Sequence, residues 1–178
     1  MALTKVRGDG VQGMSLLSTS TALALDANGH ITKPLQSAFS AHKNGTNQNN
    51  LSTSVGTTVT FSTERFDVNS DFNTSTSTFT APVTGKYFLT VTLRLENTDT
   101  AADFIISKIV TSNEKYSFIF DPNAFDIDAV YFGQTVTILA DMDANDTAYI
   151  EVRISGGTAQ TDVEGNAEYT YFTGCLVC

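Results

Sequence analysis

The stretch from Phe79 to Phe88, which reads Phe-Thr-Ala-Pro-Val-Thr-Gly-Lys-Tyr-Phe, constrains the fold more than any other part of the chain. Proline has no amide hydrogen for a sheet ladder, so Pro82 marks the edge or the entry of a strand. Gly85 permits a bend, and residues 87–93 beyond it are rich in the β-branched and aromatic residues of a long strand. The sequence therefore predicts a strand that is interrupted once and then resumes.

Short segments of this kind recur along the chain with turn residues between them, and no helix is predicted. We expect further strands at 38–41, 55–61, 103–110, 115–120, 131–140, 147–154 and 168–177, and loops around 64–67 and 71–73. The strands 131–140 and 147–154 are predicted to form a hairpin that is closed by the acidic turn 141–146. Many short strands separated by turns are typical of an all-β antiparallel sandwich.

The first part of the chain, 1–36, differs in residue pattern from the main domain predicted at 37–178. The segment from Leu23 to Pro34 predicts a β-hairpin, with Asn28 and Gly29 supplying the turn. A single short hairpin is marginally stable in water, so we expect this segment to need a docking surface or symmetry mates. The residues predicted to anchor it are Leu16, Leu17, Leu23, Leu25, Ile31 and Pro34.

The charge balance limits the partners. Nineteen acidic residues against ten basic ones give a net charge of −9, and no basic run is present. Nucleic-acid binding and binding to an anionic membrane both need a basic surface, so neither is expected. The N-terminus lacks the apolar core of a signal peptide, and no apolar run has transmembrane length, which predicts synthesis in a cytoplasm without export or membrane insertion.

The sequence carries no catalytic constellation. The two histidines, His30 and His42, fall in a predicted turn and a polar loop, and neither accompanies a nucleophile motif. Phosphate loops, dinucleotide fingerprints and zinc patterns are absent. The two cysteines stand at the end of the chain, where Cys175 is expected to be packed and Cys178 frayed. The chain is therefore predicted not to be an enzyme.

Two acidic segments are candidate calcium sites. Asp141, Asp143, Asn145 and Asp146 resemble the start of a calcium loop, in which alternate oxygen-bearing side chains converge on the ion. The glycine and the terminal glutamate of such a loop are missing, so a solvated hairpin turn is the favoured interpretation and calcium the alternative. A second acidic loop contains Asp121, Asp126 and Asp128.

Three segments in order, Ala38–Ala41, Phe79–Phe88 and Phe172-Thr-Gly-Cys-Leu176, resemble the globular head of complement component one q, which is related to tumour necrosis factor. The resemblance covers about 37–178 and implies an antiparallel jelly roll that forms a homotrimer, sometimes with calcium near the apex. It predicts core and trimer-interface roles for Phe39, Phe79, Tyr87, Phe88 and Phe172. By alternation, Phe61, Phe66, Phe72, Phe118 and Phe120 are also expected to be mainly core.

The collagen-like stalk of that family is absent, because glycine does not recur at every third position. The N-terminal segment in its place resembles segments that precede such heads in bacteriophage fibre and virion-surface proteins. This second resemblance implies a non-enzymatic protein on the virion surface. The preferred hypothesis is a fibre or spike head whose loops bind host polysaccharide or lipopolysaccharide. The alternative is a capsid decoration protein docked on other virion proteins through residues 1–36.

Overall fold

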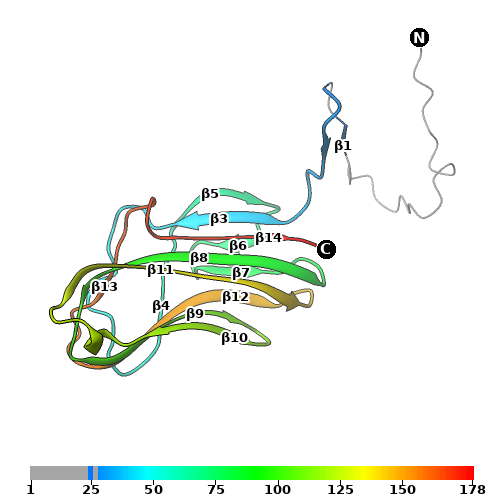
Figure 1. The fold of residues 1–178 in the computed structure, drawn as a ribbon. Coiled ribbons are helices and arrows are strands. Elements are labelled where there is room, and N and C mark those ends of the chain that lie inside the picture. Colours follow the sequence, from blue (N-terminus) through cyan, green and yellow to red (C-terminus); the bar gives the residue numbers. More distant parts are fainter. Residues whose placement is uncertain (1–23, 26–27) are drawn as a thin grey trace, which may run out of the picture. The chain divides into compact units, whose positions relative to one another are not determined.

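The computed structural model describes residues 24–25, by their backbone, and 28–178 (Figure 1). The chain divides between Leu35 and Gln36 into two compact units, one residue before the predicted boundary. In the first unit β1 (Ala24–Leu25) pairs antiparallel with β2 (Ile31–Thr32), as the predicted hairpin requires. Gly29 in the connection has a φ of +88°, a conformation that glycine adopts without steric cost.

Among the predicted anchoring residues, Ile31 is 72% exposed and Pro34 is also exposed. Leu16, Leu17 and Leu23 lie outside the described residues, and only the backbone of Leu25 is described. The anchoring role of this segment stays a prediction.

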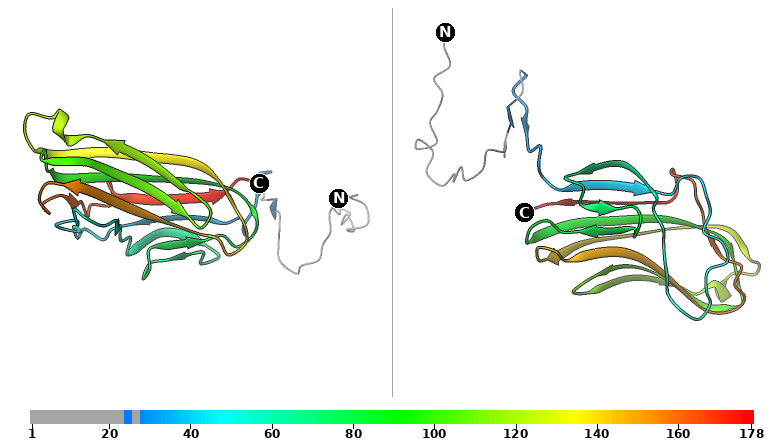
Figure 2. Two further views of the ribbon diagram at one scale, coloured as in Figure 1. Left: turned by 90° about the horizontal axis from the view of Figure 1, so that it is seen from below. Right: turned by 180° about the vertical axis from the view of Figure 1, so that it is seen from behind.

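The second unit is a sandwich of two antiparallel sheets, as the sequence predicted (Figures 1 and 2). The β9 sheet has the order β10-β9-β12-β7-β6, with β4 also paired to β12, and the β8 sheet has the order β11-β8-β14-β3-β5, with β13 also paired to β8. One 3₁₀ turn, η2 (Pro122–Ala124), follows β10. The strands are β3 (Ala38–His42), β4 (Thr57–Thr58), β5 (Thr63–Val68), β6 (Phe72–Asn73), β7 (Thr78–Thr80), β8 (Gly85–Thr98), β9 (Ala102–Thr111), β10 (Lys115–Phe120), β11 (Ala129–Met142), β12 (Thr147–Gly156), β13 (Asp162–Val163) and β14 (Tyr171–Leu176).

The predicted hairpin between 131–140 and 147–154 is wrong. Both segments are strands, but β11 pairs with β8 and β12 pairs with β9. The acidic segment between them therefore crosses from one sheet to the other. Alternation along a chain identifies strands, but it does not say which neighbour each strand pairs with. Two further differences are β5 and β6, which form strands where loops were expected, and β4, which is shorter than predicted.

An aromatic cluster around Phe39 joins the two sheets. The Phe39 ring on β3 stacks on Phe79 of β7 and Phe72 of β6, with centroids 4.7 and 5.1 Å apart, and meets Phe172 of β14 edge-on at 4.9 Å. Tyr87 on β8 extends the cluster to Phe79, and its hydroxyl donates to the Val83 carbonyl. Aromatic pairs of this geometry add stability beyond the area they bury, so this cluster fixes how the sheets face each other.

The predicted aromatic core is confirmed at Phe39, Phe79, Tyr87 and Phe172, all fully buried. Phe61 and Phe72 are buried as well. In the single chain Phe66 and Phe118 are 51% and 39% exposed, so their expected place in the core is wrong. Phe88 is 41% exposed and is not part of the core, and its predicted place in a trimer interface stays a prediction. Phe88 alternates on β8 with the buried Tyr87 and Leu89, and it points out of the sandwich.

Two glycines are needed because other groups come close to them. A side chain at Gly174 would bring Cβ to 2.8 Å from the Phe39 ring and 2.5 Å from Leu89. A side chain at Gly85 would meet the Cys178 carbonyl at 2.5 Å, since the end of the chain hydrogen-bonds to Lys86 there. Gly85 therefore allows the backbone at Cys178 to pack closely against the start of β8. The sequence had indicated only a bend at this glycine.

The substitution Gly174→Ala tests whether the Phe39 cluster holds the sandwich together. The added methyl overpacks the cluster, so we expect a loss of about 1–3 kcal/mol in the free energy of unfolding, measured by denaturant titration. Gly133→Ala is the matched control, because Gly133 also lies within a strand but has nothing within 4 Å of the added Cβ. Equal stability of the two variants would contradict the packing argument.

Candidate functional site

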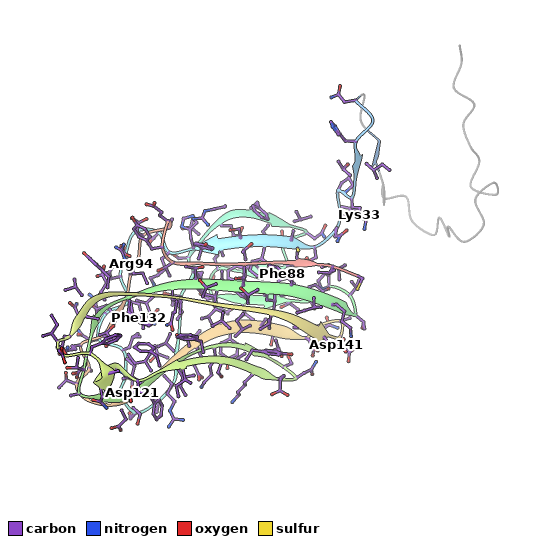
Figure 3. All side chains as sticks on the ribbon, in the orientation of Figure 1. Lys33, Phe88, Arg94, Asp121, Phe132 and Asp141 are labelled. Atoms are coloured by element: carbon purple, nitrogen blue, oxygen red, sulfur yellow. The ribbon has the colours of Figure 1, made fainter. Side chains whose placement is uncertain are left out.

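The outer face of the β8 sheet is organised in rows that run across its strands. The outward residues of β8 lie opposite the outward residues of β11, with Leu139 opposite Phe88 and Asp141 opposite Lys86. Asp141 and Lys86 form an ion pair at 2.5 Å. Figure 3 shows Phe88 and Asp141 toward the end of the sandwich where the C-terminus lies, and Arg94 toward the other end.

One row is apolar from edge to edge of this sheet. Phe88 lies opposite Leu139 on one side and Cys175 on the other, and the row continues through Ala38 to Val68. Leu139 is 59% exposed, and Cys175, expected to be packed, is only half-buried. An exposed apolar row that crosses a whole sheet is a feature of interaction surfaces.

The next rows are made of hydroxyl groups. Thr90 and Thr137 hydrogen-bond across β8 and β11 at 2.7 Å, and Thr92 and Thr135 do so at 3.1 Å. On β14 the Thr173 hydroxyl donates to the Phe39 carbonyl at 2.6 Å. These hydroxyl groups hydrogen-bond to one another or to the backbone, and they carry no formal charge. Burying this part of the face against another protein therefore has a small desolvation cost.

A charged group lies on the outer face of the β8 sheet at the end away from the C-terminus. The Arg94 guanidinium lies 3.8 Å from the Tyr169 ring centroid and 4.5 Å from that of Tyr131. It also forms ion pairs with Glu164 and, at 3.7 Å, with Glu96. Burial raises the pKa of the Glu164 carboxyl, while the charge of Arg94 lowers it. Arginine stacked between rings and paired with carboxylates is held rigidly.

The outer face of the β9 sheet has a different character. Lys108 and Glu151 form a half-buried ion pair at its centre, and Arg153 is exposed beside them. Ile119, 59% exposed, is the large apolar residue of β10 on this face. The β8 sheet is therefore the better candidate for close contact with a second protein surface, since its central rows are uncharged.

A second apolar surface lies at the edge where β10 and β11 run side by side. Phe120 of β10 stacks on Phe132 of β11 with centroids 4.0 Å apart, and Phe118 and Phe125 extend the group. We call these four residues the aromatic edge. Ile127 and Val130 beside it are 77% and 62% exposed. Because β10 and β11 each pair with one strand only, this edge also presents unpaired backbone groups.

The loops at the end away from the C-terminus are held by carboxylates. Asp99 follows β8, and its carboxylate accepts hydrogen bonds from the Thr158 amide and hydroxyl at 2.6 and 2.9 Å and from the Ala101 amide at 2.8 Å. Asp128 accepts from the Thr100 amide and hydroxyl and from Gln160. An open depression of about 400 Å³ lies beside Asp128 and Gln160. These loops present amides and carboxylates to solvent on a fixed frame.

The candidate calcium segment is tied into the protein by its own carboxylates. Asp146 accepts hydrogen bonds from the Asp143 amide at 2.8 Å and from the Asn113 side chain at 2.6 Å. Asp143 accepts from Thr84, and Asn145 occupies the left-handed region with a φ of +75°. These contacts explain how the crossing between the sheets is held. Within the described residues, no group of three or more His, Cys, Asp or Glu side chains is arranged to hold a metal ion.

The other predicted site residues are dispersed. His42 is the last residue of β3, not part of a loop, and its Nδ1 contacts the Lys43 carbonyl. His30 lies in the first unit. In the second acidic loop, Asp121 accepts from the Asn123 amide and so starts the 3₁₀ turn. No helix among the described residues is long and apolar enough to cross a membrane.

The described residues form a two-sheet antiparallel sandwich whose β8 sheet has uncharged central rows on its outer face. The chain matches the family of the C1q domain over residues 38–177 and therefore belongs to it. Domains of the C1q and tumour necrosis factor type form homotrimers, and they bind ligands or build structures and are not enzymes.

Solved structures agree with this fold. The globular domain of zebrafish complement 1qA protein is 21% identical, with a TM-score of 0.55 over 80% of this chain and 98% of that one. Murine APRIL at pH 8.5 is 9% identical, with a TM-score of 0.57 over 80% and 99%. Eiger TNF from S. frugiperda is 13% identical, with a TM-score of 0.52 over 80% and 94%. No curated protein matches the sequence.

The contacts of Asp99 predict a pH dependence of stability. Hydrogen bonds from the Thr158 and Ala101 amides hold the pKa of its carboxyl below the ordinary value of 3.8, against the opposing effect of burial. A lowered folded-state pKa contributes stability above the unfolded value, and this is lost as pH falls through the folded pKa. We expect Asp99→Asn to melt below wild type at neutral pH, with the gap closing as pH falls below 3.8.

The control is Asp103→Asn in the same thermal melts, because the exposed Asp103 accepts one hydrogen bond, from Ser155 at 3.4 Å. A gap for Asp99→Asn that stays constant across this pH range would contradict the assignment.

Proposed function

We propose that the protein is a homotrimeric, non-enzymatic component of a virion surface, most specifically a bacteriophage fibre or spike head that binds the host cell. The observation that supports the trimeric assembly is the apolar row through Phe88, next to uncharged rows of threonine on the same sheet face. The virion setting rests on the resemblance of the N-terminal segment to segments of phage fibre proteins. No cofactor is required in this proposal, and calcium at Asp141–Asp146 is an optional metal ligand.

The proposed trimer uses both apolar surfaces of the sandwich. The face around Phe88 and the aromatic edge around Phe132 are different surfaces of one chain, so a contact between them is heterologous. Heterologous contacts between copies continue until a ring closes, and three copies form such a ring in domains of this type. The contact covers the exposed row and protects the unpaired edge of β11, which would otherwise be a site for aggregation.

Recognition of the host is assigned to the loops at the end away from the C-terminus. The rigid carboxylate network around Asp99 and Asp128 holds amide and hydroxyl groups in fixed positions, and such groups bind the hydroxyls of a surface glycan. The host polysaccharide or lipopolysaccharide is therefore the proposed partner. Residues 1–36 are proposed to attach the head to other virion proteins.

The capsid decoration protein is the second candidate, favoured by the hairpin of β1 and β2, which presents Ile31 at 72% exposure for docking. The copy number per virion, measured by quantitative mass spectrometry against the major capsid protein, separates the two candidates. A ratio that fits a few fibres at a tail or vertex supports host attachment. A ratio near that of the shell protein supports decoration, and absence from purified virions contradicts both.

Host attachment has its own test. Purified protein added before infection should saturate receptors and reduce adsorption of the virus in proportion to its concentration. A protein that neither binds host cells nor reduces adsorption would contradict the adhesin role.

The substitution Phe88→Asp tests the proposed interface. Burying an unpaired carboxylate in each of the three contacts is unfavourable, so the variant should run as a single 19.1 kDa chain where wild type has three times that mass in sedimentation equilibrium. Ile119→Asp, an equally drastic change on the outer face of the β9 sheet, should leave the trimer intact. Dissociation by Ile119→Asp alone would assign the interface to the other sheet.

A further inference from the structure

We propose that Lys43 is the anion-binding group of a saccharide site, and that the ligand is a sugar bearing a negatively charged group such as the carboxylate of a uronic acid. The site lies directly after β3, at the end of the sandwich away from the C-terminus (Figures 1 and 2). The choice of a sugar rests on the proposed role in host binding, whereas the anion preference rests on the contacts of Lys43 alone.

Lys43 is an unusual lysine for a surface loop. Its side chain is buried, with 4% of the residue exposed, and the Nζ atom donates to the Thr60 hydroxyl at 2.9 Å and to the Thr60 carbonyl at 3.2 Å. An ammonium group has three donors, so these two bonds leave one. Both acceptors are neutral oxygen atoms. They hydrogen-bond to the ammonium group, but they do not neutralise its positive charge.

No counter-ion for Lys43 comes from the described chain. None of its carboxylates forms an ion pair with the Nζ atom. Glu96, whose carboxylate accepts a hydrogen bond from the cavity residue Asn47, is paired with Arg94. Burial without a partner lowers the pKa of Lys43. Buried charges in proteins are normally paired, so an unpaired one beside an open cavity indicates a counter-ion that arrives from outside.

The cavity that Lys43 lines suits a small polar ligand. Its volume is about 390 Å³, and the other lining residues are all amides or hydroxyls: Asn44, Thr46, Asn47, Gln48, Thr60 and Ser62. This volume lies within the range of roughly 300–1,000 Å³ that is usual for small-molecule sites. An ammonium group surrounded by amides and hydroxyls matches the anion and the hydroxyl groups of an acidic sugar.

Part of the cavity wall is held rigid and part is free to bind. Gln48 accepts from the Thr60 amide and donates to the Thr58 carbonyl, and Asn47 accepts from the Gly165 amide at 2.8 Å. Within the described residues the side chains of Asn44 and Ser62 make no such bonds, and both are exposed. The site therefore combines a fixed frame with two polar groups that remain available to a ligand.

The test is a titration of the full-length protein with sodium glucuronate, with inorganic phosphate and with glucose, followed by amide chemical shifts. We expect saturable shifts in the loop 43–48 with glucuronate and none with glucose. Saturation by phosphate and not by glucuronate would keep Lys43 as the anion site and assign it to a phosphate-bearing glycan. Failure of both anions to saturate would overturn the proposal.

Three variants separate the effect of the Lys43 charge on binding from a general effect on the fold. Lys43→Met should weaken glucuronate binding by about tenfold or more, as expected for loss of a charge-assisted hydrogen bond. Ser62→Tyr, which places a bulky ring on an exposed lining residue of the cavity and leaves the lysine in place, should weaken it as well. Lys115→Met removes the same charge from an exposed position on β10 and should have no effect. Unchanged glucuronate affinity in Lys43→Met would overturn the proposal, whatever the result for Ser62→Tyr.

The outcome is independent of the virion assignment, because the titration uses purified protein. Glucuronate binding by a protein that is absent from virions would keep the Lys43 site and reject the proposed function. A protein that blocks infection but binds neither anion would do the reverse.

Discussion

The packing of Phe39 between the two sheets is the contact on which the rest of the molecule depends. Its ring stacks on two aromatic residues of the β9 sheet and meets Phe172 of its own sheet edge-on. Gly174 is without a side chain because that ring passes over it. With the sheets fixed in this way, β8 and β11 run as two paired strands of fourteen residues each, and their outward side chains form straight rows.

Those rows give the domain two kinds of surface. The apolar row through Phe88 and the neighbouring threonine pairs can be covered by another protein without burying a charge, whereas the Lys108–Glu151 pair on the other sheet would have to be desolvated. The loops beyond the far ends of the strands carry the amides, carboxylates and the buried Lys43. In the proposed function, assembly and recognition therefore use different parts of one sandwich, so loop residues could vary without loss of the proposed trimer.

Much of this fold is predictable from the sequence, because strand periodicity and the bend at Pro82 and Gly85 are local features. The positions of β3, β8, β9 and β12 and the burial of Phe39 and Tyr87 follow from them. Pairing partners are not local, so 131–154 was interpreted as a hairpin when it crosses between sheets. Phe88 was predicted as a core or trimer-interface residue, and alternation from the buried Tyr87 points it outward, away from the core.

The Lys43 cavity has no signal in the sequence at all. A lysine in a polar loop is normally solvated, and its burial depends on Thr60, which lies seventeen positions away along the chain. The same holds for Arg94, whose ring contacts come from Tyr131 and Tyr169. Sites built from residues of separate loops emerge only when the sandwich brings the loops together.

The most direct test of the account uses the native thiols. Cys175 lies in the apolar row beside Phe88, and Cys178 is exposed at the end of the chain. Alkylation kinetics followed by tandem mass spectrometry measure both in one sample. If a second copy covers the face, Cys175 should be protected in wild type and should react readily in Phe88→Asp, while Cys178 reacts in both. Equal reactivity of Cys175 in wild type and Phe88→Asp would contradict assembly through this face.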